Sequence, residues 1–134
     1  MTIEEINVLI RDGFMGMLGI EFTSCTEDRV EALMPVSPKL HQPTGSVHGG
    51  ALISLAESVG SAGSFLQVDP VKYQVYGSVV NAQHLHPARE GILYATASLV
   101  SRGEFKHIWD VEIRDGDNKL ISISRVTNSV KPRS

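Results

Sequence analysis

The chain has little cysteine, no blocks of like charge and no long apolar run. Its single cysteine, Cys25, cannot form an intramolecular disulfide or a four-thiolate metal site, and this favours a reducing compartment such as the cytoplasm. The 12 basic and 15 acidic side chains are dispersed and give a net charge of -3, which offers no basic surface for a nucleic-acid backbone. We therefore expect no nucleic-acid partner.

Segments that direct a chain to a membrane are also missing. The N-terminus carries Glu4 and Glu5 where a secretory signal would be basic, and no apolar run approaches the roughly 18 residues that span a bilayer. The chain shows no low-complexity stretch, no linker and no internal repeat. We expect one domain over residues 1–134, without a membrane partner.

The spacing of apolar residues predicts two helices. Thr2 followed by Glu5 is typical of a capping box, and the apolar residues after it predict a short helix over 3–12, ended by Gly13. A second, much longer helix is expected over 48–66.

The rest of the chain indicates β structure. Alternating residues predict two short strands between 18 and 36 around a turn at 26–28, and a loop over 39–47 leads into the long helix. Four further strands, expected to form a meander, are predicted over 73–85, 93–101, 105–114 and 120–127. A sheet this long with one apolar helix inserted early predicts an α+β fold, in which a curved antiparallel sheet wraps around a central helix.

Glu57 is the only charged residue of the long helix. The rest of its polar side is serine and glycine, so we expect the helix to be enclosed and the acid to be buried. A carboxylate in a partly dry cleft is suited to act as a general base or as a nucleophile. An ordinary surface acid is the alternative.

Serines accompany this acid on the helix. Ser61 lies one turn after Glu57, where it could hold a water, and Ser54 and Ser58 are further neighbours. A stripe of apolar residues on the other side of the helix from Glu57 is expected to pack in the core. It consists of Leu52, Leu55, Ala56, Val59 and Ala62.

The sequence His48-Gly49-Gly50 marks the helix start. Free backbone N–H groups at this end can stabilise a negative oxygen, although a Gly-Gly pair can also be a simple turn. The amide of Gln42 could donate to a substrate carbonyl, the alternative being a solvated side chain. Gly49 and Glu57 are separated by about 12 Å of helix rise, so one site could be shared between two subunits.

Other nucleophiles and metal ligands have less support. His84 and His86 have the spacing of a metal pair, but no further ligands complete a set, so no metal is expected. The serines lack the Gly-x-Ser-x-Gly context of a hydrolase elbow, and nothing near Cys25 indicates an activated thiol.

Several motifs taken together resemble one family, the hotdog-fold acyl-CoA thioesterases. The branch in question contains 1,4-dihydroxy-2-naphthoyl-CoA hydrolases, phenylacetate-pathway thioesterases and one class of 4-hydroxybenzoyl-CoA thioesterases. The resemblance extends from about Gly13 to Thr127. It rests on Gln42 with His48-Gly49-Gly50, Glu57 with Ser61, Asn81-Ala82-x-His84, Arg89-Glu90-Gly91 and Trp109-x-Val111-x-Ile113.

The resemblance implies a role for each matching residue. Glu57 would attack the thioester or activate water, with Ser61 positioning that water. Gly49 would polarise the thioester carbonyl, Gln42 would align with it, and His48 would support the helix start. His84 would line the acyl pocket. Apart from the resemblance, we also expect Ser58 and Gly50, which neighbour these residues on the helix, to contact the substrate.

The resemblance also implies a hotdog fold, no metal or organic cofactor, and dimers that often pair into tetramers with sites across the interface. For the naphthoyl branch it implies a place in menaquinone biosynthesis. The chain departs from the branch pattern at His86-Pro87 and at 101–106, where acyl or nucleotide contacts could be set, so the acyl group stays open.

We therefore predict an acyl-CoA thioesterase that cleaves an aromatic or medium-chain acyl-CoA to the free acid and CoA. The alternatives are a hotdog dehydratase acting on acyl thioesters, a non-catalytic acyl-CoA binding module and a purely structural homodimer.

Overall fold

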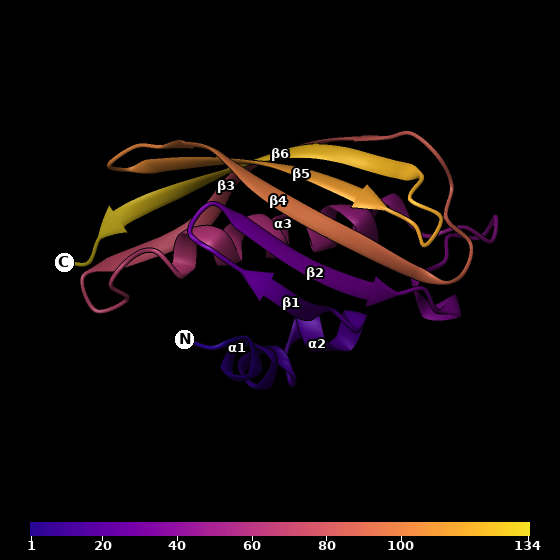
Figure 1. Ribbon diagram of the computed structural model, residues 1–134, viewed down its shortest axis with the longest axis horizontal. Helices are drawn as coiled ribbons and strands as arrows, with labels where there is room; N and C mark the ends of the chain where they lie inside the picture. The colour runs from indigo at the N-terminus through magenta and orange to yellow at the C-terminus, as the bar shows by residue number, and fades with distance from the viewer.

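A six-stranded antiparallel sheet curls around one helix, α3 (Gly49–Phe65), in the computed structural model, which describes residues 1–134 (Figure 1). The strands are β1 (Glu21–Cys25), β2 (Arg29–Pro35), β3 (Tyr73–His84), β4 (Ile92–Arg102), β5 (Lys106–Arg114) and β6 (Leu120–Pro132). This arrangement confirms the predicted hotdog fold. None of the helices has both the length and the apolar composition that crossing a bilayer requires.

The N-terminal helix is shorter than predicted and is followed by a second one. In α1 (Ile3–Ile10) the Thr2 hydroxyl accepts a hydrogen bond from the Glu5 N–H at 3.1 Å, which confirms the capping box. Gly13 does not simply end this helix, because it is the N-cap of α2 (Phe14–Leu18). Sequence periodicity missed α2 because five residues are too few to show a helical repeat. A 3-10 turn, η1, spans Pro38–Leu40.

The predicted meander is correct for three strands and wrong for the fourth. The sheet order is β1-β2-β4-β5-β6-β3, so β3 pairs with β6, and β2 takes the place beside β4. Alternation in the sequence identifies a strand but does not identify its partner. The last strand also continues past the predicted end at Thr127 to Pro132.

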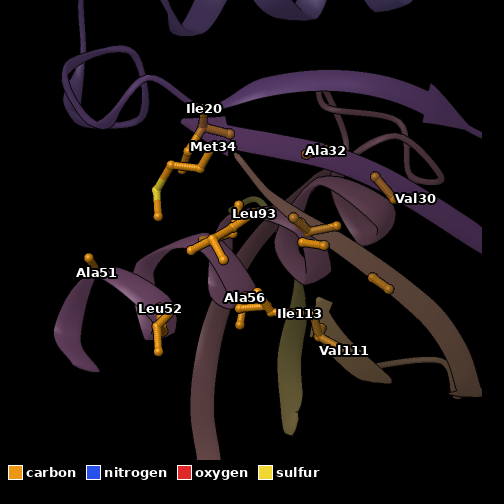
Figure 2. Close-up of a cluster of buried hydrophobic side chains, with 14 of the residues drawn as sticks. Ile20, Val30, Ala32, Met34, Ala51, Leu52, Ala56, Leu93, Val111 and Ile113 are labelled. Carbon is orange, nitrogen blue, oxygen red and sulfur yellow. The ribbon is translucent and has the colours of Figure 1, made fainter. Parts of the chain in front are cut away.

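The core lies between α3 and the inner face of the sheet. The predicted helix stripe is buried except for Ala62, which is half-buried, and it faces inward side chains such as Met34, Leu93 and Ile113 (Figure 2). Each fully buried Leu, Val or Ile contributes roughly 1.5–3 kcal/mol relative to an exposed one. This packing places one side of α3 against the sheet and leaves the Glu57 side outside it.

The two edge strands of the sheet, β1 and β3, differ in what lies beside them. Beside β1, the Asn7 side chain from α1 donates to Phe22 O at 2.9 Å and accepts from Phe22 N at 2.8 Å, so it occupies the edge as a neighbouring strand would. At the other edge, β3 pairs with β6 alone, and most of its residues are exposed. An uncovered edge strand of 12 residues is a surface on which another strand can pair.

Candidate active site

A cavity of about 580 Å³ lies between the N-terminal helices and the outer side of α3. Most of its walls are apolar, and Glu57 is the only charged side chain among them. The polar walls are completed by Ser54, Ser58 and Ser61. The apolar walls include Ile6, Leu9, Phe14, Met15 and Phe65. The structure therefore brings together the predicted acid and its serines at one apolar cavity.

Sequence reasoning missed the contribution of α1 and α2 to this cavity. In the sequence, the apolar side chains of these segments indicate only that they pack against the core. In the structure, Leu9 and Phe14 are exposed and lie in the cavity wall. Nothing local in the sequence indicates that these helices face α3 across a space.

The predicted burial of Glu57 is wrong for the single chain. Glu57 is exposed and forms neither an ion pair nor a hydrogen bond. Most of the sheet packs on the opposite stripe of α3, and only the edge strand β3 comes near the acid. The carboxylate lies over β3, where a methyl group placed on Gly77 would be 3.2 Å from Glu57 Oε2. Any further enclosure of Glu57 has to come from outside this chain.

The serine hydroxyls of the cavity differ in the acceptors to which they donate their hydrogen bonds. Ser54 Oγ donates to Gly50 O at 2.8 Å, and Ser58 Oγ donates to Ser54 O at 2.6 Å, so both hydroxyls are bonded to their own helix. Ser58 can therefore meet a substrate only as an acceptor. Ser61 is different, because its hydroxyl is directed off the helix toward Asn128 Oδ1 of β6, at 3.5 Å.

The helix start provides one free donor. His48 is the N-cap of α3, and its Nδ1 accepts from the Gly50 N–H at 2.8 Å. Gly50 therefore has no free N–H for a substrate. The N–H of Gly49 has no partner in the chain, as a first-turn donor of a helix is expected to have none. Gly49 is thus the residue whose backbone can stabilise an oxyanion.

His84 stands beside this donor. A methyl group placed on Gly49 would lie 3.0 Å from His84 Nε2, a tight contact that would displace the ring by a few tenths of an ångström. His84 Nδ1 is 2.9 Å from Ser122 Oγ, which in turn donates to Gln83 O at 3.2 Å. Sequence reasoning missed Ser122, because it faces His84 only through the register of β3 and β6.

Gln42 is folded back into its own loop. Its Nε2 donates to Thr44 Oγ1 at 3.0 Å and to Ser46 Oγ at 2.9 Å, so both amide hydrogens are engaged. The expected donation from Gln42 to a substrate carbonyl is therefore not available in this conformation. The carbonyl oxygen of the side chain is the atom that remains free.

The predicted site residues fall into two groups on one chain. One group, Glu57, Ser58 and Ser61, lines the cavity. The other group lies outside the cavity and consists of Gln42, His48, Gly49, Gly50 and His84. The structure does not unite the carboxylate and the free N–H of one chain around a single cavity.

The remaining candidate groups show no reactive arrangement. No group of three or more His, Cys, Asp or Glu side chains is placed to hold a metal ion, and His86 Nδ1 bonds to Leu120 O at 2.9 Å. Burial raises the pKa of the Cys25 thiol, which disfavours the reactive thiolate at neutral pH.

Comparisons with known proteins extend over nearly the whole chain. The family model described as Thioesterase superfamily matches residues 44–122. The 1,4-dihydroxy-2-naphthoyl-CoA hydrolase of Escherichia coli strain K12 is 35% identical over 130 residues, covering 97% of this chain and 95% of that protein. A mutant thioesterase from Pseudomonas aeruginosa has a TM-score of 0.95 at 37% identity, covering 99% of this chain and 96% of that one. A thioesterase from Haemophilus influenzae has a TM-score of 0.93 at 38% identity, covering 98% and 92%.

Proposed function

Because the chain belongs to the thioesterase superfamily and is a thioester hydrolase, we propose that it cleaves an aromatic or medium-chain acyl-CoA to the free acid and CoA. The aromatic acyl groups are of the hydroxynaphthoyl, hydroxybenzoyl or phenylacetyl type. The single cysteine favours the cytoplasm as its compartment.

One observation carries this proposal: the apolar cavity has a single carboxylate in its wall. A volume of about 580 Å³ falls within the range of small-molecule sites, and the rings of Phe14 and Phe65 suit an aromatic or aliphatic acyl group. The 35% identity with the 1,4-dihydroxy-2-naphthoyl-CoA hydrolase of Escherichia coli supports an aromatic acyl group in particular.

The hydrolysis mechanism that we propose uses the Glu57 carboxylate, Ser61 and the Gly49 N–H. A water held beside Ser61 gives a proton to Glu57 as its oxygen attacks the thioester carbon. The carbonyl oxygen becomes an oxyanion that accepts from the Gly49 N–H at the positive end of α3. Collapse of the tetrahedral intermediate breaks the carbon–sulfur bond, and the proton passes from Glu57 to the thiolate of CoA. The products are a carboxylic acid and a thiol, with no other reactant.

We further propose that the site is completed by a second copy of the chain. Glu57 and the Gly49 N–H lie about 12 Å apart along one helix, too far to serve the same carbonyl. The uncovered edge of β3 lies beside the Glu57 carboxylate. Pairing there would bring the helix start of one subunit toward the cavity of the other, and two such dimers could form a tetramer.

The decisive test is Glu57→Gln with thiol release as the measurement. We expect a fall in kcat of at least about 10²-fold, the scale of general-base removal, with an unchanged circular dichroism spectrum. Glu112→Gln is the matched control, since Glu112 is an exposed acid on β5, outside the cavity. Near-normal thiol release by Glu57→Gln would overturn the mechanism.

A substrate panel addresses the acyl group. We expect benzoyl-, hydroxynaphthoyl- or phenylacetyl-CoA to give higher kcat/KM than long straight-chain acyl-CoAs. Product analysis runs alongside, because a dehydratase would leave the thioester intact and a binding module would release no thiol. A flat response across the panel would contradict an aromatic preference.

A further inference from the structure

A single pair of residues in the sheet lies beneath both proposed reactive side chains. Gly77 of β3 and Asn128 of β6 face each other across the antiparallel ladder. The Glu57 carboxylate lies over Gly77, and the Ser61 hydroxyl is directed at Asn128. We propose that this pair positions Glu57 and Ser61 for attack by water, an inference that rests on the proposed thioesterase function.

The amide of Asn128 has only one orientation that fits its surroundings. Asn128 is fully buried, and its Nδ2 donates to Gly60 O at 3.1 Å and to Ser64 Oγ at 2.8 Å. A backbone carbonyl can only accept, so the nitrogen has to face Gly60. The Oδ1 atom is therefore fixed on the side of Ser61, at 3.5 Å from its hydroxyl.

Ser64 prevents this arrangement from reversing. Its oxygen accepts from Asn128 Nδ2 and from Trp109 Nε1, the latter at 2.9 Å, which uses both lone pairs. Its one proton is then left for His107 Nδ1, at 2.9 Å. The donors of Asn128, Trp109 and Ser64 each have an acceptor in this buried cluster, so reversing any one of these bonds would leave a buried polar group unpaired.

The fixed Oδ1 determines how Ser61 meets water. Because Oδ1 is an acceptor, Ser61 gives it the hydroxyl proton, and the lone pairs of Ser61 are left toward the cavity. A water between Ser61 and Glu57 then donates one hydrogen to each. Its own lone pair remains free to attack the thioester carbon. If Ser61 donated to the water instead, it would occupy that lone pair.

Gly77 performs the corresponding task for the carboxylate. A methyl group on Gly77 would lie 3.2 Å from Oε2 and 3.5 Å from Cδ of Glu57, closer than such contacts normally allow for the nearer atom. The carboxylate would have to move by a few tenths of an ångström. The lack of a side chain at Gly77 thus determines how closely the Glu57 carboxylate approaches β3.

The test of Asn128 compares two substitutions that both remove its donors. Asn128→Asp keeps an acceptor toward Ser61, whereas Asn128→Ala does not. We expect Asn128→Ala to lower kcat about tenfold or more with KM changed less than about twofold, and Asn128→Asp to retain more kcat than Asn128→Ala. A purely structural role predicts the reverse, because the buried charge of Asp destabilises more than Ala does.

A double-mutant cycle with Ser61→Ala makes the coupling explicit. Once the Ser61 hydroxyl is gone, adding Asn128→Ala should lower kcat by less than about twofold further. If the two effects instead multiply, Asn128 does not act through Ser61 and the proposal is overturned. Circular dichroism at the assay temperature verifies that each variant is folded.

Gly77→Ala tests the carboxylate independently and keeps the proposal falsifiable if the Asn128 variants unfold. We expect kcat to fall about tenfold with little change in KM, because a small misplacement of a reacting group is costly. Gly116→Ala is the control, since a methyl group there meets nothing within 4 Å. An unchanged kcat in Gly77→Ala would remove Gly77 from the proposal.

The outcomes separate this inference from the proposed function. If Glu57→Gln keeps its activity, the thioesterase mechanism fails and the positioning role fails with it. If Glu57→Gln is inactive while the Gly77 and Asn128 variants keep wild-type kcat, the mechanism stands and only the positioning role is overturned.

Discussion

His107 shows at the residue scale how a hydrogen-bond pattern fixes a charge state. It is 4% exposed, and Ser64 donates to its Nδ1, which requires an unprotonated nitrogen there. Burial lowers the pKa of His107 from its ordinary value of 6.5, and the nearby charge of Arg102 lowers it further. The neutral ring is therefore part of the folded structure.

A pH dependence of stability follows from that shift. Below 6.5 the unfolded chain binds a proton at His107, whereas the folded chain does not until a lower pH, so the stabilisation is complete above 6.5 and is lost as the pH falls. We expect the urea midpoint to fall as the pH is lowered below 6.5. His107→Gln, which keeps an acceptor but does not titrate, should flatten this fall. An equal fall in wild type and variant would assign it to other groups.

Residues at the helix start show the limits of a motif. His48-Gly49-Gly50 predicts backbone donors, and the structure shows that His48 uses the Gly50 N–H and leaves that of Gly49 without a partner. Gln42 likewise matches a motif, yet its amide hydrogens bond within its own loop. A motif names residue types, and hydrogen-bond partners depend on conformation.

At the scale of elements, the small residues of α3 allow it to approach the sheet closely. A methyl group on Gly63 would lie 2.4 Å from Cζ2 of Trp109, and one on Gly60 would lie 2.9 Å from Cβ of Val126. Trp109 is fully buried on β5 and has no room to withdraw. Gly60 and Gly63, which the sequence assigns to the polar side of the helix, are therefore sites of close contact with the sheet.

Gly63→Ala should destabilise the protein although alanine favours helix formation by about 1 kcal/mol over glycine. The clash with Trp109 lies toward the upper end of the roughly 1–3 kcal/mol typical of overpacking, so after the helix gain we expect a net loss of about 1–2 kcal/mol in the free energy of unfolding, measured with urea. Trp109→Leu removes the ring atoms and should reduce the added cost of Gly63→Ala. A stabilised Gly63→Ala protein would show that the helix has room to move.

At the scale of the whole molecule, the sheet has one closed edge and one open edge. Asn7 occupies the edge of β1, whereas β3 pairs with β6 alone. Both edge strands contain an irregular position, at Thr23 in β1 and at Ser78 in β3, and both residues are exposed. They provide matched positions for testing where a second chain binds.

We expect Ser78→Lys to weaken self-association at least about tenfold, because a twofold interface places like charges near each other. Thr23→Lys at the closed edge should leave the mass distribution in sedimentation velocity unchanged. If both variants remain as associated as wild type, the interface does not use β3. If dissociation also lowers kcat, the site depends on the second chain.

Much of the fold could be predicted from the sequence. Periodicity placed the long helix within one residue at each end, and turn residues separated the strands correctly. The place of β3 beyond β6 and the five-residue α2 could not be predicted, because strand partners and very short helices leave no periodic signal.

The sequence by itself determined the chemistry available: one carboxylate among small residues, a serine one turn later and a glycine pair at a helix start. These are local patterns, and local spacing on a helix fixes which side chains share a face. Only the tertiary structure decided that Glu57 is exposed, that an apolar cavity lies beside it, and that Gly77 and Asn128 lie beneath it. Those facts depend on contacts between residues far apart in the chain, which no local pattern records.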